Sequence, residues 1–259
     1  MGFADSPEYL CRNPPCAART EKWAKPDVLV EVDAHTMKYP AVLFDLDGTL
    51  IDSNYHHVSA WSRALSDAGI PIPMWKIHRR IGMSGKSFLQ ELLREMSKTK
   101  RTRDLESLEK KHDALFRREI PRLNPLPGAN ELLKHLAQQR IRIAIATTGG
   151  REQTSRLLRQ IKVPKQMAIV TGDDAEKAKP SPDIFVAAAE KLGTPINECI
   201  VVGDSAWDLL AAGRKSALGV GVLSGGYGEE ELERAGAFRV YADAADMLQH
   251  LEQLGLPGQ

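Results

Sequence analysis

Short apolar runs alternate with helical patterns along the chain from residue 41 onward. Five of these runs have the length of buried strands, and they cover residues 41–44, 141–146, 167–170, 199–202 and 218–223. Apolar residues recur at helical spacing between the runs, which predicts helices over residues 128–139, 151–161, 182–192, 206–213 and 243–254. Strands that alternate with helices are typical of an α/β fold, so we expect a doubly wound parallel sheet.

The interval between residues 52 and 127 breaks this alternation, because it holds helical patterns and no run typical of a strand. The predicted helices cover residues 55–68, 74–81, 86–96 and 105–120. A helical block inserted after the first strand lies at the carboxyl end of the sheet, where open α/β sheets bind ligands. We therefore predict an all-helical cap domain over residues 55–125 and a catalytic core made of residues 38–54 and 126–259.

Residues 1–37 form an N-terminal extension in this interpretation, and we expect it to be poorly ordered. The segment contains prolines and scattered charges without a sustained helical or strand period. A short apolar run at residues 28–32 is its only candidate strand, and Met37 directly precedes the first clear strand.

Composition and charge narrow the class of protein. The 259 residues carry a formal net charge of +1, with basic and acidic residues interleaved, so we expect neither a nucleic-acid nor a membrane partner. No apolar run approaches the roughly 20 residues that cross a bilayer, and the N-terminus lacks the apolar region of a signal peptide. Cys11, Cys16 and Cys199 cannot form a disulfide framework. We predict a cytoplasmic protein, and the pattern makes no prediction of oligomeric state.

Two carboxylates, Asp45 and Asp47, follow the first apolar run directly. Carboxylates this close at the end of a buried strand are costly unless a cation lies near them. A Ca²⁺ loop also begins with Asp-x-Asp, but it needs glycine at its sixth position and glutamate at its twelfth. Here Gly48 is fourth and His56 is twelfth, which excludes that loop. The pair therefore predicts a functional site.

The segment Asp-Leu-Asp-Gly-Thr at residues 45–49 resembles the first motif of the haloacid dehalogenase (HAD) superfamily, and three more motifs follow in that family's order. Residues 144–148 resemble the second motif, residues 179–183 the third and residues 201–208 the acidic fourth. The resemblance covers about residues 38–254. It implies a Rossmann-like HAD core with a helical cap, in the branch of phosphoglycolate phosphatase and β-phosphoglucomutase.

The resemblance also implies a chemistry. Asp45 would be the nucleophile that forms an aspartyl-phosphate, and Asp47 the general acid and base. The cofactor would be Mg²⁺, bound by the side chains of Asp45 and Asp204 and by the backbone carbonyl of Asp47. The implied class is a phosphoric monoester hydrolase acting on a small phosphate ester, of the sugar-phosphate or phosphoglycolate type.

Further residues would bind the phosphate or support the metal. Thr147, Thr148 and Lys179 match the phosphate-binding positions, and Asp208 lies one helical turn beyond Asp204, where it would support the metal. Taken alone, these residues have ordinary structural interpretations as well. Thr147 fits a helix cap, Lys179 a surface lysine and Asp208 a solvated helix residue.

Substrate specificity is expected in the cap, where the candidates are His57, Arg79, Arg80 and Lys86. The three basic residues among them also fit a solvated helix end. Alternative functions are a phosphomutase of the β-phosphoglucomutase type and a phosphonoacetaldehyde hydrolase, whose relatives use a cap lysine such as Lys86 as a Schiff base. A catalytically silent relative that binds a ligand or partner is the third alternative.

Overall fold

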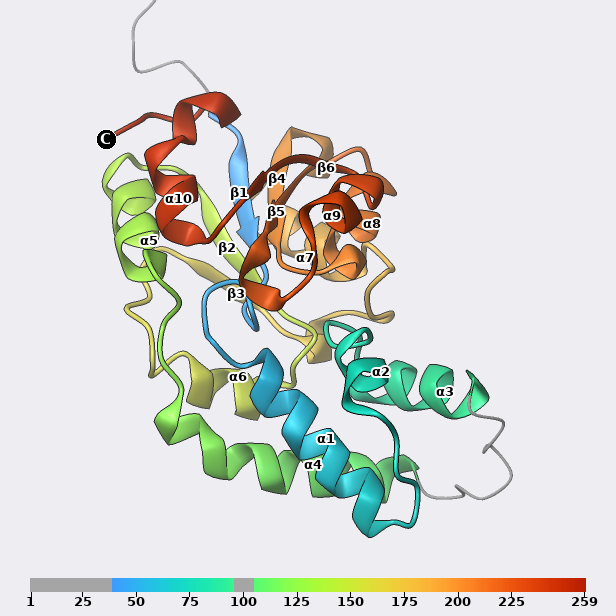
Figure 1. Cartoon of the computed structure of the whole chain (residues 1–259). Helices are drawn as coiled ribbons and strands as arrows, with labels where there is room; N and C mark the ends of the chain where they lie inside the picture. Colours follow the sequence, from blue (N-terminus) through green and yellow to red (C-terminus); the bar gives the residue numbers. More distant parts are fainter. Residues whose placement is uncertain (1–38, 96–104) are drawn as a thin grey trace, which may run out of the picture. The chain divides into compact units, whose positions relative to one another are not determined.

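Six parallel strands form one sheet with the order β3-β2-β1-β4-β5-β6 (Figure 1). This computed structural model describes residues 39–95 and 105–259. The strands are β1 (Ala41–Phe44), β2 (Ile143–Ala146), β3 (Ala168–Val170), β4 (Cys199–Gly203), β5 (Leu218–Val222) and β6 (Ala237–Tyr241). The predicted doubly wound parallel sheet is therefore confirmed, and the described residues form one compact unit.

Strand β1 lies at the centre of the sheet, and its four residues are fully buried. Phe44 pairs with Ile145 of β2 and with Val202 of β4, so the three strands end at the same level. The backbone N–H of Asp45 still donates to Val202, at 2.9 Å. The residues that follow these strands are therefore brought together at the carboxyl edge of the sheet.

Helices cover both faces of the sheet (Figure 1). On one face, Val42 and Phe44 share an apolar cluster with α5 (Ala129–Gln138) and α10 (Ala244–Gln249). On the other face, Ala41 and Leu43 share a cluster with α7 (Asp183–Lys191) and α8 (Ala206–Gly213). Because successive side chains of a strand point to opposite faces, a continuous apolar run such as β1 supplies both clusters.

In the interval between β1 and β2, the described residues form four α-helices before α5, and none of the strands of the sheet, as predicted for the cap. They are α1 (Asn54–Asp67), α2 (Met74–His78), α3 (Gly85–Glu95) and α4 (Leu105–Glu119). They share an apolar cluster of their own that includes Trp61, Phe88 and Leu89. The predicted helix over residues 86–96 corresponds to α3, and its last predicted residue, 96, lies outside the described residues. The exact division into core and cap stays a prediction.

One strand and one α-helix of the described residues were missed by the sequence patterns, β6 and α9 (Glu229–Arg234). Strand β6 is at the edge of the sheet, and its residues Phe238 and Arg239 are exposed, so it lacks the continuous apolar run of a central strand. Helix α9 has six residues, of which only Leu232 is buried. Such a helix is too short and too charged to show a helical period.

Three predicted helices end earlier than expected. The predicted helix 74–81 is α2, which ends at His78. The predicted helix 151–161 is α6 (Arg151–Leu157), and it gives way to turns in which Gln160 donates to the carbonyl of Leu157. The predicted helix 243–254 is α10 followed by a 3₁₀ turn at Leu251–Leu254. At the break, Nδ1 of His250 lies 2.9 Å from the carbonyl oxygen of Asp246, the acceptor that a continued helix would use.

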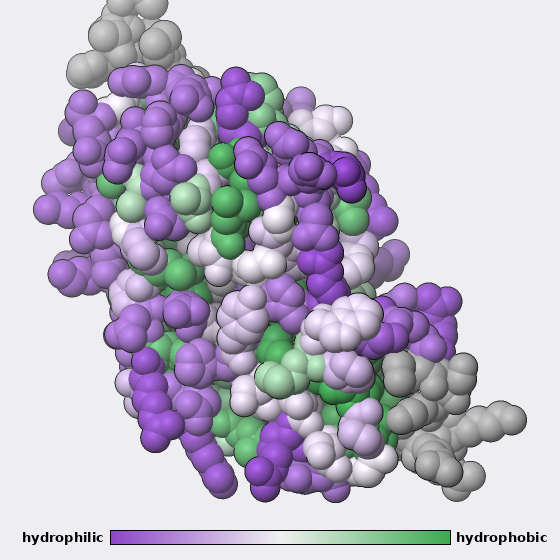
Figure 2. Space-filling model, in the orientation of Figure 1, coloured by the Kyte–Doolittle hydropathy of each residue, from purple (hydrophilic) through white to green (hydrophobic). Residues whose placement is uncertain are grey.

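The predictions for residues 1–37, including the candidate strand at 28–32, lie outside the described residues. Within the part of the chain that the structure describes, no helix has both the length and the apolar character to span a membrane. Hydrophilic side chains cover most of the face shown in Figure 2, with smaller apolar areas between them. Cellular location stays a prediction.

Neighbouring leucines of α8 offer a matched test of this fold. Leu209 is fully buried, whereas Leu210 is 40% exposed. We expect Leu209→Ala to lower the free energy of unfolding by about 2–5 kcal/mol, because it leaves a cavity in the core. Leu210→Ala should lower it by less than about 1 kcal/mol. Urea unfolding monitored by circular dichroism measures both, and equal losses would contradict the described packing of α8.

Candidate active site

Asp45 lies directly after β1, with only 3% of its surface exposed. Nζ of Lys179 lies 2.5 Å from Oδ1 of Asp45 and 2.7 Å from Oδ1 of Asp208. Lys179 has no exposed surface, so its interpretation as a surface lysine is wrong. The ammonium joins two carboxylates that the sequence separates by more than 160 residues.

Burial and charge act against each other in this group. Burial opposes the charge of Lys179, but the carboxylates of Asp208 and Asp45 outweigh it and raise the pKa of Lys179 above its usual value. Burial also raises the pKa of Asp45 to about 7; Lys179 opposes this rise, whereas Asp208 adds to it. Asp45 therefore needs positive charge beyond that of Lys179 to be fully ionised at neutral pH.

Asp208 is held by the start of α8. The backbone N–H and the hydroxyl of Ser205 donate to Oδ2 of Asp208, at 3.1 and 2.5 Å, in a capping box. The other carboxylate oxygen, Oδ1, contacts Lys179. Asp208 has no exposed surface, so its interpretation as a solvated helix residue is wrong.

Asp204 follows β4 and receives hydrogen bonds from neutral side chains. The hydroxyl of Thr49 donates to Oδ1 at 2.9 Å, and the amide of Asn54 donates to Oδ2 at 2.7 Å. Burial and the neighbouring carboxylates of Asp208 and Asp45 raise the pKa of Asp204 well above its usual value. The two neutral donors therefore do not compensate its charge.

Backbone packs closely against Asp204 on two sides. A Cβ atom at position 225 would lie 1.8 Å from Oδ2 of Asp204, and one at position 48 would lie 2.7 Å from the same oxygen. Gly48 also has a φ of +76°, a conformation that favours glycine. Only glycine therefore fits at Gly48 and Gly225, and both loops confine the carboxylate.

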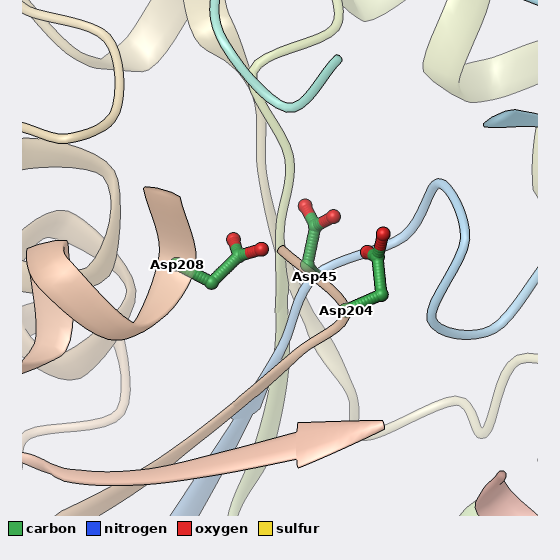
Figure 3. A group of neighbouring side chains, drawn as sticks. All are labelled: Asp45, Asp204 and Asp208. Carbon is green, nitrogen blue, oxygen red and sulfur yellow. The ribbon is translucent and has the colours of Figure 1, made fainter. Parts of the chain in front are cut away.

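Carboxylate oxygens of Asp45, Asp204 and Asp208 all lie within 4.8 Å of one another, and all three residues are buried. Figure 3 shows Asp45 and Asp204 side by side at the ends of neighbouring strands, with Asp208 reaching toward them from α8. Lys179 brings one positive charge to three carboxylates. The surplus of buried negative charge and the all-oxygen donor set fit a divalent cation of the Mg²⁺ type.

Asp47 is oriented by residues that begin the cap. The hydroxyl of Ser53 donates to Oδ1 of Asp47 at 2.5 Å, and Nε2 of His57 lies 3.2 Å from the same oxygen. Burial opposes ionisation, but the hydrogen bond and charge of His57 outweigh it and lower the pKa of Asp47. Among the described residues, no hydrogen bond reaches Oδ2.

The two predicted phosphate-binding threonines follow β2. The hydroxyl oxygen of Thr147 accepts from the backbone N–H of Gly149 at 3.1 Å. Helix α6 is capped at Gly150, so the interpretation of Thr147 as the cap of this helix is wrong. The hydroxyl of Thr148 donates to the carbonyl of Gly82 at 3.3 Å, which links this loop to the cap.

Core and cap residues line a shared cavity of about 610 Å³. The predicted site residues in its wall are Asp45, Asp47, His57, Lys86, Thr147 and Thr148. Lys179, Asp204 and Asp208 are not in the wall, and they lie in the interior beside Asp45. The structure thus brings the core candidates together around one cavity.

The other two basic cap candidates do not line this cavity. Arg79 forms an ion pair with Glu231, and its guanidinium lies 4.5 Å from the ring centroid of Tyr227. Arg80 forms an ion pair with Glu95. Of the three basic candidates, Lys86 alone reaches the cavity wall. The assignment of Arg79 and Arg80 to specificity stays a prediction.

Several residues that contact the candidates were missed by the sequence analysis. Ser53 has the position and chemistry of a helix cap, yet its hydroxyl contacts Asp47 rather than the first turn of α1. His112 lies in a charged stretch of α4 that does not suggest a buried site. Its spacing from Leu108 and Phe116, four residues on either side, was the available signal.

Known proteins are similar to this chain in fold and in sequence. A model of the haloacid dehalogenase-like hydrolase family matches residues 39–214. A hydrolase of known structure from Pseudomonas syringae is 48% identical, with a TM-score of 0.80, over 83% of this chain and 98% of that chain.

Curated relatives match at lower identity. A phosphoglycolate phosphatase from Agrobacterium fabrum is 28% identical over 72% of this chain and 81% of its own length. A β-phosphoglucomutase from Bacillus subtilis is 29% identical over 71% of this chain and 84% of its own length. The chain therefore belongs to the haloacid dehalogenase-like hydrolases, which confirms the family and the enzyme class predicted from the sequence.

Proposed function

We propose that the chain is a Mg²⁺-dependent phosphatase that hydrolyses a small phosphorylated metabolite through an aspartyl-phosphate on Asp45. The observation that carries the proposal is the placement of Asp45 in the cavity wall, with Lys179 at 2.5 Å behind it and Asp47 in the same wall. The similarity to the phosphoglycolate phosphatase from Agrobacterium fabrum supports a substrate of the sugar-phosphate or phosphoglycolate type.

In the first step, a carboxylate oxygen of Asp45 attacks phosphorus, and the ester P–O bond breaks. Hydrogen bonds from the described residues reach only Oδ1 of Asp45, so Oδ2 is the attacking atom. The bonding electrons pass to the leaving oxygen, which takes a proton from Asp47. In the second step, Asp47 removes a proton from water while the water oxygen attacks phosphorus, and Asp45 is released with inorganic phosphate.

Binding of the phosphate requires positive charge, because a phosphate dianion and a carboxylate repel each other. Lys179 supplies one charge, and the hydroxyls of Thr147 and Thr148 would donate hydrogen bonds to the phosphate, Thr148 in exchange for its contact with Gly82. Bound Mg²⁺ would supply the remaining positive charge and polarise the phosphoryl group. Asp45 and Asp204 would hold it with their side chains and Asp47 with its carbonyl, and Asp208 would support them through Lys179.

A phosphomutase is the second candidate, favoured by the similarity to the Bacillus subtilis β-phosphoglucomutase. In that reaction a sugar phosphate, rather than water, would accept the phosphoryl group. The two functions differ in product, since a mutase gives isomerised sugar phosphate and little free phosphate.

The proposal is tested with a panel of phosphate esters that includes 2-phosphoglycolate, glucose 6-phosphate and 4-nitrophenyl phosphate. We expect Mg²⁺-dependent phosphate release that EDTA stops. Asp45→Asn should lower it by at least about a thousandfold, because the amide is a poor nucleophile. The matched control is Asp52→Asn, which alters an exposed aspartate seven residues away and should keep wild-type activity. Full turnover in EDTA or in Asp45→Asn would overturn the proposal, and so would isomerised sugar phosphate without phosphate release.

The raised pKa values predict how pH affects the metal-free protein. The pKa of Asp45 is about 7 in the folded protein against 3.8 ordinarily. A raised pKa contributes stability that is complete below about 3.8 and is lost as pH rises through about 7. With EDTA present, we therefore expect the melting temperature to fall between pH 5 and pH 8.

Mg²⁺ should reduce this fall, since the cation stabilises the ionised carboxylates. Asp204→Asn should also reduce the fall in EDTA, because it removes one of the repelling charges, and it should abolish the stabilisation by Mg²⁺. Asp52→Asn serves again as the control and should melt like the wild type. Equal melting profiles with and without Mg²⁺ in the wild type would contradict the assigned metal site.

Lys86 provides a test of the cap. If this lysine binds an anionic or polar leaving group, Lys86→Ala should lower kcat/KM for 2-phosphoglycolate about tenfold relative to 4-nitrophenyl phosphate. Arg63→Ala, which removes an exposed basic residue of α1, should leave this ratio unchanged. An unchanged ratio in Lys86→Ala would assign Lys86 to the solvated surface. Complete loss of activity, with borohydride trapping of a carbonyl substrate, would instead indicate a Schiff base.

A further inference from the structure

A series of three polar contacts runs from Asp47 into the cap. Nε2 of His57 lies 3.2 Å from Oδ1 of Asp47, and Nδ1 of His57 lies 3.0 Å from Nε2 of His112. Nδ1 of His112 in turn lies 3.0 Å from Oδ1 of Asp113. We call His57, His112 and Asp113 the histidine array. His57 belongs to α1, and the other two residues belong to α4.

Aromatic packing fixes the two imidazole rings of the histidine array. The ring of His57 stacks on Phe116 with a centroid distance of 3.7 Å, and the ring of His112 stacks on Trp61 at 4.1 Å. Both histidines are buried. Neither ring can turn without losing its stacking partner, so the direction of each ring nitrogen is set by the packing of the cap.

The direction of the hydrogen bonds in the histidine array follows from the chemistry of the ring. A neutral imidazole has one N–H group, which donates, and one bare nitrogen, which accepts. Burial lowers the pKa of His112 to about 4, so this ring is neutral and has one N–H group. Asp113 is half exposed, and its carboxylate can only accept. The N–H of His112 therefore points to Asp113, and Nε2 of His112 accepts from Nδ1 of His57.

This assignment leaves the third contact, between His57 and Asp47. Nδ1 of His57 is directed at His112, so Nε2 is the ring nitrogen directed at Oδ1 of Asp47. This contact is made at the residue proposed as the general acid, in the wall of the cavity.

We propose that His112 and Asp113 are positioning residues for the reaction, which act on Asp47 through His57 by fixing the orientation of the His57 ring. The inference rests on the proposed role of Asp47.

The test compares esters that differ in their need for a proton. An alkoxide leaves poorly unless it is protonated, whereas 4-nitrophenolate leaves without protonation. We measure kcat/KM, which covers the steps up to the aspartyl-phosphate, for 4-nitrophenyl phosphate and for one alkyl ester. The alkyl ester is 2-phosphoglycolate or glucose 6-phosphate, whichever of the two the wild type hydrolyses faster. The variants are Asp113→Ala, which alters a half-exposed residue, and His112→Phe, which keeps an aromatic ring against Trp61.

Both variants should lower kcat/KM for the alkyl ester about tenfold and change that for 4-nitrophenyl phosphate less than about twofold. Asp113→Asn retains an acceptor oxygen and should recover most of the loss. Glu106→Ala removes an exposed carboxylate from the same helix and should leave the ratio of the two esters unchanged. Equal losses for both esters would show a purely structural role and would overturn the inference.

If no ester is hydrolysed, the proposed function is overturned, and the inference is then decided by a spectroscopic measurement that needs no turnover. In the full-length protein labelled with ¹⁵N-histidine, the ring shifts of His112 should show a protonated Nδ1 and an unprotonated Nε2 at pH 7. Asp113→Ala should move His112 toward a mixture of tautomers. A wild-type His112 with its proton on Nε2 would overturn the inference.

Discussion

Lys179 carries a full positive charge with no exposed surface, and the active site is arranged around it. A buried ammonium is costly unless carboxylates pair with it, and removal of one partner from a buried ion pair typically destabilises a protein by about 3–5 kcal/mol. Asp45 at the end of β1 and Asp208 in the first turn of α8 are those partners. The ion pairs therefore connect elements that are distant in sequence, and each of the three residues constrains the position of the other two.

Asp204 lies in the same acidic cluster without an ammonium of its own. Its hydrogen-bond donors, Thr49 and Asn54, are neutral, and the backbone at Gly48 and Gly225 approaches too closely for a larger residue to enter. The carboxylate can therefore neither turn away nor gain a cationic side chain from these loops. Such a site is stable either with a proton on the cluster or with a bound cation, which is the physical basis for the metal dependence proposed above.

The sequence predicted the central fold because buried parallel strands have a strong pattern. β1, β2 and β4 are continuous apolar runs, and Asp45, Thr147 and Asp204 follow them within one residue. The edge strand β6 was missed because exposure removes that pattern. Side-chain partners were also missed, since contacts such as those of Asn54 with Asp204 and of His112 with His57 join residues 55 to 150 positions apart. No local pattern encodes such distances, so their roles required the structure.

The two proposed catalytic carboxylates depend on different parts of the protein. Asp45 is held by Lys179 from the core, whereas Asp47 is oriented by Ser53 and His57, which lie at and just after the start of the cap helices. Because the ring of His57 packs on Phe116 of α4, a change in cap packing reaches Asp47 before it reaches Asp45. Sequence changes that alter the packing of His57 can therefore change how the leaving group is protonated while Lys179 still holds the proposed nucleophile. In this arrangement the cap contributes to the protonation of the leaving group, and not only to the recognition of the substrate.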